Sequence, residues 1–248
     1  MKEQNEDWFA TWFDTNYYHT LYQNRDYKEA AFFISNLMSH LDLPSGSAIL
    51  DLACGKGRHS LQLSEMGHQV KGVDLSPNSI HLANKLIEDR TNLSFDVLDM
   101  RETLPNVEFD AVLNLFTSFG YFDDYSDNLK VLNSIAAMLK PGGTFLIDFM
   151  NPTKVQNNLV DKETKHLDGI TFNLTRNVID GKIVKNIQFT DQGKNHSYFE
   201  KVQAITLSDF EKLIAQTDLK IEATFGNYAL DTFNENESDR LILLGSKN

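Results

Sequence analysis

Cysteine is almost absent from this chain of 248 residues, and basic residues are fewer than acidic ones. Cys54 is the single cysteine, which excludes an internal disulfide and a multi-cysteine metal site, so we predict no metal site. The net charge of −12 repels phosphate backbones and argues against a nucleic-acid partner. No apolar run approaches the ~20 residues of a membrane span, and residues 1–7 lack a signal peptide's character. We therefore expect a cytoplasmic protein that binds no membrane.

The first 46 residues combine aromatic side chains with a helical pattern. Seven aromatic residues lie within the first 22 positions. Further on, Ala30, Ile34, Leu37 and Leu41 recur with the spacing of one helix face, which predicts a helix over residues 27–41. Pro44 and the serine and glycine that follow it end the pattern. We expect residues 1–46 to form an aromatic, helical cap.

The next stretch, residues 47–150, alternates short apolar runs with helical patterns. Strands are predicted at residues 48–52, 69–73, 93–97, 111–115 and 144–149. Between them, helices are predicted to begin near Gly57 and at Pro77, with Ser76 as N-cap, and to cover residues 127–139. This alternation predicts an α/β fold with a mostly parallel sheet. Residues 206–248 return to it, with one helix and strands at residues 219–225 and 241–245.

Residues 165–205 have a different character. Apolar and polar residues alternate over residues 170–178, and Asp180-Gly181 is a hairpin turn signal before a returning strand at 183–189. A third strand is predicted over residues 198–205. The pattern predicts an antiparallel insert without a helix of its own.

The strongest local motif runs from Ile49 to Ser60, where an apolar strand leads into a glycine turn and then a helix. Glycines let a backbone approach a ligand closely, and a helix N-terminus favours negative charge. A dinucleotide-binding fingerprint would need glycine or alanine at position 60, where this chain has Ser60. Asp51, inside the approach to the turn, suits a cationic or hydrogen-bond-donating ligand better than a pyrophosphate.

Two further acids follow later strands. Asp74 lies at the end of the next predicted strand, 17 residues past Gly57, where a carboxylate accepts hydrogen bonds from ribose hydroxyls. Asp99-Met100 follows the third strand, and this acid and thioether suit an exocyclic amine and a ring face. Ligands of open α/β sheets bind at this edge, so the three motifs are expected to share one cleft.

These motifs, with Leu139 to Gly143, resemble the ordered motifs of class I S-adenosylmethionine-dependent methyltransferases. The resemblance covers residues 47–150 well and residues 206–248 more loosely. It implies a doubly wound, Rossmann-like sheet of seven strands whose last strand is antiparallel. The domain plan that follows is a cap at residues 1–46, a cofactor-binding core at 47–150 and 206–248, and an antiparallel lid insert at 151–205.

The resemblance also implies roles for single residues. The glycine turn holds the methionine part of S-adenosylmethionine, Asp74 binds the ribose, and Asp99 binds the adenine amine. Asp51 orders the turn or reaches the cofactor's amino end, while Asn114 lines the methionine moiety and the substrate. The residues predicted to bind the cofactor are Tyr17, Tyr22, Asp51, Ala53, Gly55, Gly57, Arg58, Asp74, Leu75, Asp99, Met100 and Asn114.

The insert resembles the lid of small-molecule N- and O-methyltransferases, including amino-sugar and glycine types. The Pro-Pro signature of DNA amino-methyltransferases is missing at residues 114–122. We therefore predict methyl transfer to nitrogen or oxygen of a small metabolite. No general base is evident, and the acceptor-side candidates are His19, Asn114, Tyr121, Arg176, Glu200 and Tyr228. Arg176 shares a strand face with apolar residues and needs an anionic partner, either an acidic substrate group or Glu200.

Two other functions remain open on the sequence. A nicotinamide-dependent oxidoreductase is disfavoured by Ser60 and Asp51 in the turn. A non-catalytic cofactor-binding module would use the aromatic N-terminus as a partner surface. The sequence leaves the oligomeric state open between monomer and homodimer.

Overall fold

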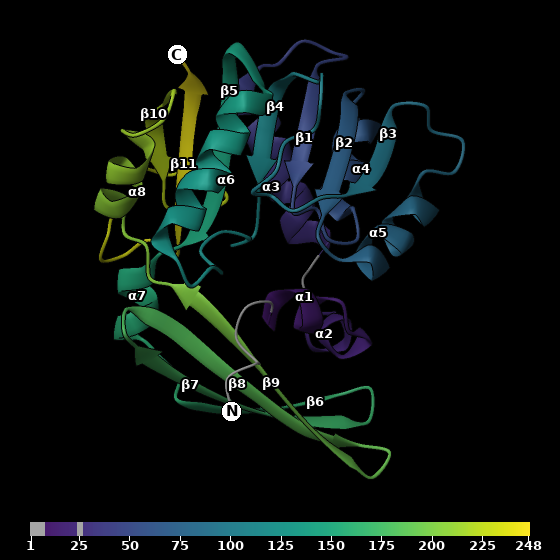
Figure 1. The fold of residues 1–248 in the computed structure, drawn as a ribbon, viewed down its shortest axis with the longest axis vertical. Coiled ribbons are helices and arrows are strands. Elements are labelled where there is room, and N and C mark those ends of the chain that lie inside the picture. The colour runs from purple at the N-terminus through teal and green to yellow at the C-terminus, as the bar shows by residue number, and fades with distance from the viewer. Residues whose placement is uncertain (1–7, 24–26) are drawn as a thin grey trace.

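A computed structural model describes residues 8–23 and 27–248, and these form two separate sheets (Figure 1). The larger sheet has seven strands in the order β10-β11-β5-β4-β1-β2-β3. Its strands are β1 (Ala48–Leu52), β2 (Gln69–Asp74), β3 (Leu93–Val97), β4 (Phe109–Asn114), β5 (Leu139–Met150), β10 (Leu219–Phe225) and β11 (Arg240–Lys247). Strands β1 to β5 pair in parallel, and β11 is antiparallel to both β5 and β10. The predicted α/β fold with an antiparallel last strand is confirmed.

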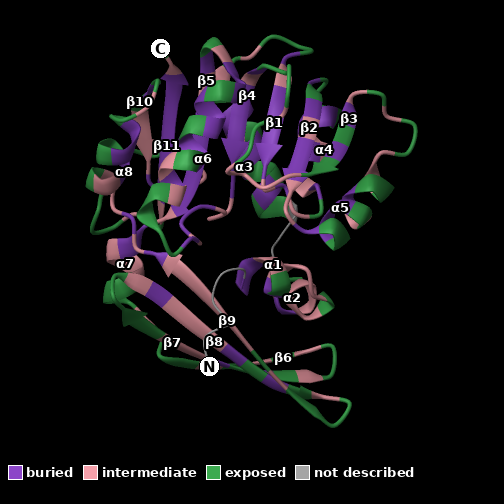
Figure 2. Cartoon of the chain, viewed as in Figure 1, coloured by how far each residue is buried: buried purple, intermediate pink, exposed green. Residues whose placement is uncertain are grey.

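Helices cover both faces of this sheet, and its central strands are buried between them (Figure 2). One layer holds α3 (Tyr27–Leu41), α4 (Arg58–Glu65), α5 (Pro77–Ala83) and the 3-10 helix η1 (Asn84–Leu86), and the other holds α6 (Tyr125–Met138) and α8 (Leu207–Ile214). The apolar stripe of α3 is buried as predicted, since Ala30, Ile34 and Leu37 have no exposed surface. Ser76 caps α5 with Pro77 in its first turn, also as predicted. No helix in the described ranges is long and apolar enough to cross a membrane.

The smaller sheet contains four antiparallel strands rather than the three predicted. They are β6 (Lys162–Leu167), β7 (Ile170–Ile179), β8 (Lys182–Asp191) and β9 (Lys194–Gln203), and α7 (Pro152–Asn157) precedes them. None of the side chains of β6 is fully buried. Its sequence therefore has no alternation of apolar and polar residues, and the strand was not predicted. The third predicted strand begins four residues earlier and ends two residues earlier than expected, because β9 pairs with β8 along its whole length.

The N-terminal segment, residues 8–23, lies between the two sheets and carries α1 (Trp8–Phe13) and α2 (Asn16–Leu21) (Figure 1). On the side of the small sheet, the Trp12 ring packs 4.7 Å from the Tyr198 ring of β9. Towards the large sheet, the carboxylate of Asp14 accepts hydrogen bonds from the Ser76 hydroxyl at 2.5 Å and from the Asn78 amide at 3.0 Å. This segment therefore joins the start of α5 to the inner face of the small sheet.

Candidate functional site

The turn after β1 is left-handed at Ala53 (φ 64°), Gly55 (φ 56°) and Gly57 (φ 77°). A Cβ atom at Gly57 would lie 2.5 Å from the Phe95 ring of β3, so only glycine fits against that ring. A Cβ atom at Gly55 would have no other atom within 4 Å. The turn therefore packs closely on one side and exposes its backbone on the other.

Buried polar residues support this turn from behind. The Asp51 carboxylate is 1% exposed and accepts a hydrogen bond from the Ser60 hydroxyl at 2.5 Å. Burial raises the pKa of Asp51 to about 6 although that hydrogen bond opposes the rise. The amide of Asn114 donates to the Leu52 carbonyl, and Asn114 Oδ1 has no partner within the described ranges. Ser60 therefore fills the position of the missing fingerprint glycine and bonds to Asp51.

The two acids after β2 and β3 differ in their surroundings. Asp74 accepts hydrogen bonds from the Gly55 amide at 2.8 Å and the Ser76 amide at 2.9 Å, and burial raises its pKa. Burial also acts to raise the pKa of Asp99, but the hydrogen bonds and charge of Arg101 outweigh it and lower that pKa. Asp99 therefore stays ionised, and the oxygens of Asp74 are held in place by the glycine turn.

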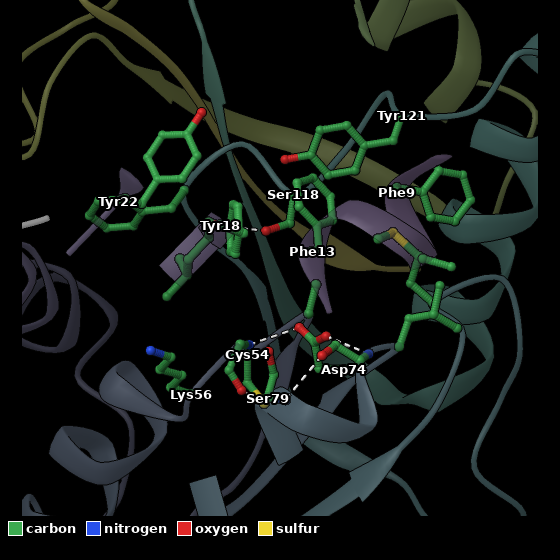
Figure 3. Close-up of a pocket in the computed structure, with 18 of the residues that line it drawn as sticks. Phe9, Phe13, Tyr18, Tyr22, Cys54, Lys56, Asp74, Ser79, Ser118 and Tyr121 are labelled. Carbon is green, nitrogen blue, oxygen red and sulfur yellow. Dashed lines mark hydrogen bonds between the residues drawn. The ribbon is translucent and has the colours of Figure 1, made fainter. Parts of the chain in front are cut away.

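A first cavity of about 330 Å³ opens at these strand ends (Figure 3). In the close-up, Asp74 and Cys54 lie on one side, and Phe13, Tyr18, Tyr22 and Tyr121 lie across from them. Eight of the residues predicted to bind the cofactor line it: Tyr22, Ala53, Gly55, Arg58, Asp74, Leu75, Asp99 and Met100. Four others, Tyr17, Asp51, Gly57 and Asn114, do not.

The residues of the first cavity fit S-adenosylmethionine. Its volume lies within the range of about 300–1,000 Å³ that is typical of ligand sites. The open backbone at Gly55 admits the chain of an amino acid, and Asp74 and Asp99 can accept hydrogen bonds from hydroxyl and amine groups. Lys56 and Arg58 add basic groups for a carboxylate. No group of three or more metal-ligating side chains occurs in the described ranges.

Two N-terminal residues that the sequence singled out, Tyr17 for the cofactor and His19 for the acceptor, lie in different places. His19 lines the first cavity, and burial together with the charge of Lys56 lowers its pKa to about 4, so its imidazole is neutral at neutral pH. The hydroxyl of Tyr17 instead donates to Asp191 of β8 at 2.9 Å. Tyr17 therefore contacts the small sheet, whereas the sequence placed it over the cofactor.

A second cavity of about 620 Å³ adjoins the first. Both are lined by the same five aromatic residues, namely Phe13, Tyr18, Tyr22, Phe116 and Tyr121. The rest of the second cavity is mostly polar, with Glu29, Glu200, Asp239 and Arg240 among its residues, and Tyr228 contributes a further aromatic ring. The sequence singled out Glu200 and Tyr228 but missed Asp239 and Arg240, which no local motif marks.

Glu200 is the centre of a network under the N-terminal segment. Its carboxylate accepts hydrogen bonds from Trp12 Nε1 at 2.8 Å and the Tyr22 hydroxyl at 2.6 Å. Lys185 Nζ donates to the same Tyr22 hydroxyl and lies 3.4 Å from the carboxylate. Burial lowers the pKa of Lys185, and the charge of Glu200 only partly offsets that shift. The network connects Tyr22, which lines both cavities, to the small sheet.

Arg176 does not pair with Glu200, one of the two anionic partners that the sequence left open for it. Arg176 pairs with Glu163 of β6 and donates to the Val160 carbonyl, and it lines neither cavity. Since β6 was not predicted, its acid was not considered as a partner. Arg176 is therefore placed away from both cavities.

Comparison with known proteins agrees with the fit of the first cavity to S-adenosylmethionine. The methyltransferase domain family matches residues 43–203. A Bacillus subtilis protein is 36% identical over 114 residues, a match that spans 46% of each chain. The dTDP-3-amino-3,4,6-trideoxy-alpha-D-glucopyranose N,N-dimethyltransferase of Streptomyces venezuelae is 28% identical over 208 residues, 81% of this chain and 86% of that enzyme.

A solved S-adenosylmethionine-dependent methyltransferase from Clostridium acetobutylicum has the same fold. It superposes with a TM-score of 0.79 at 22% identity and covers 97% of this chain and 98% of its own. The family match spans more than half of the chain and includes the glycine turn, Asp74 and Asp99. The chain therefore belongs to the methyltransferase domain family and is an S-adenosylmethionine-dependent methyltransferase.

Proposed function

We propose that this enzyme methylates the amine nitrogen of a small polar metabolite. The observation that carries the proposal is the second cavity, where three carboxylates stand beside an aromatic wall shared with the cofactor cavity. Carboxylates and aromatic faces both attract an ammonium group. The amino-sugar N,N-dimethyltransferase similar to this chain acts, by its name, on such a nitrogen.

The same proposal assigns the predicted cofactor residues. Asp74 would bind the ribose hydroxyls, Asp99 the adenine amine, and the turn at Gly55 the methionine part. We also propose that residues 1–46 act as the cap, residues 151–205 as the lid, and the remaining segments as the core. A cytoplasmic location and the absence of a nucleic-acid substrate are part of the proposal, which the net charge of −12 supports.

The chain's contribution to the reaction is positioning and control of a proton. Bound S-adenosylmethionine supplies a methyl group activated on a sulfonium sulfur. The five shared aromatic residues exclude water between the two cavities and offer apolar faces to a methyl group. An ammonium must lose its proton before its nitrogen can attack. The Tyr22 hydroxyl, which donates to Glu200 Oε1, is placed to pass that proton from the cavity to the carboxylate.

Neither alternative function gains support. An oxidoreductase would need a turn that accepts a pyrophosphate, yet the buried acid at Asp51 bonds to Ser60 directly behind this turn. A non-catalytic module would use the N-terminal aromatics as an exposed surface, yet Trp8, Phe9 and Trp12 are buried.

The test compares matched acceptors. Small amines, including amino sugars and amino acids, are paired with analogues in which a hydroxyl replaces the amine, and product is followed as S-adenosylhomocysteine. We expect turnover of at least one amine and at least a hundredfold lower kcat/KM for its hydroxyl analogue. Equal or better turnover of the hydroxyl analogue would overturn the proposal.

A further inference from the structure

Two consecutive residues after β4 adopt a backbone conformation that residues other than glycine rarely adopt. Phe116 has φ 59° and Thr117 has φ 60°, both in the left-handed region. An aromatic and a β-branched side chain are poor choices for that region, so the surrounding structure must hold them there. This pair of residues is hereafter the strained turn.

One buried ion pair holds the strained turn. Asp148 of β5 has no exposed surface, and its Oδ2 accepts a hydrogen bond from the Phe116 amide at 2.9 Å. The main-chain carbonyl of Asp148 accepts from the Thr117 amide at 2.8 Å. Arg240 of β11 donates from Nε to Asp148 Oδ1 at 2.7 Å and from a terminal nitrogen to Thr117 Oγ1 at 2.9 Å. Both residues of the turn are thus bonded to the same pair.

The strained turn lies where the two cavities meet. On the cofactor side, the Phe116 ring stacks on His59 with centroids 4.9 Å apart and lies 4.9 Å from the Arg58 guanidinium. On the acceptor side, the same ring stacks on Tyr228 at 5.4 Å. The Thr117 carbonyl accepts a hydrogen bond from the Tyr121 hydroxyl. A change in the turn would therefore move two of the five aromatic residues that both cavities share, Phe116 and Tyr121.

Stability alone is a weak reason for such a pair. Replacing a buried ion pair by apolar residues of similar size often leaves a protein equally stable, because removing charges from water is costly. The main-chain carbonyl of residue 148 accepts from the Thr117 amide whatever its side chain is, but the two side chains of the pair add directed hydrogen bonds to the Phe116 amide and the Thr117 hydroxyl. Apolar residues would not supply those directions.

We propose that Asp148 and Arg240 are positioning residues for methyl transfer, which hold the strained turn so that its side chains align the acceptor cavity with the cofactor cavity. The inference rests on the proposed acceptor cavity, but it applies to a nitrogen or an oxygen acceptor alike. Asp148 lines neither cavity, and Arg240, which lines the second cavity, is assigned here to holding the turn rather than to the reacting atoms.

The test uses Asp148→Asn, Arg240→Met and, as a rescue, Asp148→Asn combined with Thr117→Gly. The matched control is Leu146→Ala, which removes a fully buried side chain from the same strand. We expect Asp148→Asn and Arg240→Met each to lower acceptor kcat/KM at least tenfold. The Kd of S-adenosylhomocysteine, measured by calorimetry, should change less than the acceptor kcat/KM does, because the pair acts on the cofactor cavity through Phe116 and Tyr121 rather than through Gly55, Asp74 or Asp99.

The rescue distinguishes positioning from general destabilisation. Glycine adopts the left-handed region without strain, so Thr117→Gly should restore kcat/KM of the Asp148→Asn enzyme at least threefold, although it gives up the hydrogen bond from Arg240 to Thr117 Oγ1. In Asp148→Asn, amide hydrogen exchange at Phe116 and Thr117, measured without any acceptor, should accelerate at least tenfold. In Leu146→Ala, exchange at these two residues should accelerate no more than exchange in β5 does.

Two results would overturn the inference. One is a kcat/KM within twofold of wild type for Asp148→Asn. The other is an equal loss of kcat/KM in Leu146→Ala when the two variants have the same melting temperature. A wild-type enzyme that methylates only hydroxyl acceptors would instead overturn the proposed function. The same variants, assayed on those acceptors, would then still decide the positioning claim.

Discussion

Replacing Glu200 by glutamine tests the contact that fastens the N-terminal segment to the small sheet. The carboxylate and the Lys185 side chain are 14% and 13% exposed, so solvent screens their interaction only weakly. Breaking a buried pair by removing one charge costs about 3–5 kcal/mol. Glutamine keeps one oxygen for Trp12 or Tyr22, so we expect a loss of about 2–3 kcal/mol at pH 7.

The loss of unfolding free energy in Glu200→Gln should become smaller as the pH rises. Burial lowers the pKa of Lys185 below its ordinary 10.5, and Glu200 opposes that shift. Without Glu200 the pKa falls further, so the folded state carries a cost for keeping Lys185 charged. That cost is fully present below the folded-state pKa and falls as the pH rises from that pKa towards the ordinary value of 10.5. The stability difference between Glu200→Gln and wild type should therefore shrink from pH 7 towards pH 10.

Urea unfolding followed by tryptophan fluorescence measures both effects. Lys185→Met is the matched control, because combining it with Glu200→Gln removes the unpaired charge and should recover most of the loss. A loss below about 0.5 kcal/mol at pH 7, the range of ordinary surface substitutions, would refute the reasoning. So would a difference that grows as the pH rises.

Four further substitutions test other contacts. Asp74→Asn should weaken S-adenosylhomocysteine binding at least tenfold by calorimetry, about 1.4 kcal/mol, and unchanged affinity would remove this acid from the cofactor site. Gly57→Ala should destabilise by about 2–4 kcal/mol, because it adds a steric overlap to left-handed strain. Gly55→Ala, with open space, should cost only the strain of about 1–2 kcal/mol, and equal melting temperatures for the two would contradict this. Asp14→Ala removes three hydrogen bonds at the start of α5 and should cost about 1 kcal/mol in urea unfolding, while a neutral result would mean that the link is weak.

The large sheet was predictable because its central strands are buried on both faces. Such strands are continuous apolar runs, and the turns that follow them carry glycine or acid residues in sequence. Strand β6 has no such run, since its side chains are all at least partly exposed. The error at Arg176 followed from that omission, because its partner Glu163 lies on the missed strand.

The acceptor side was harder to predict because its contacts join distant parts of the chain. Asp148 and Arg240 are 92 residues apart, and the hydroxyl of Tyr17 reaches Asp191 across 174 residues. No local pattern encodes those pairings. The left-handed backbone at Phe116 and Thr117 was also hidden, because neither residue type favours it.

A crystal structure with bound S-adenosylhomocysteine tests the central claim most directly. We expect the ribose at Asp74, the adenine at Asp99, and the sulfur facing the aromatic residues shared with the second cavity. A ligand that lies outside the first cavity, or whose sulfur is separated from the second cavity by the strained turn, would contradict it.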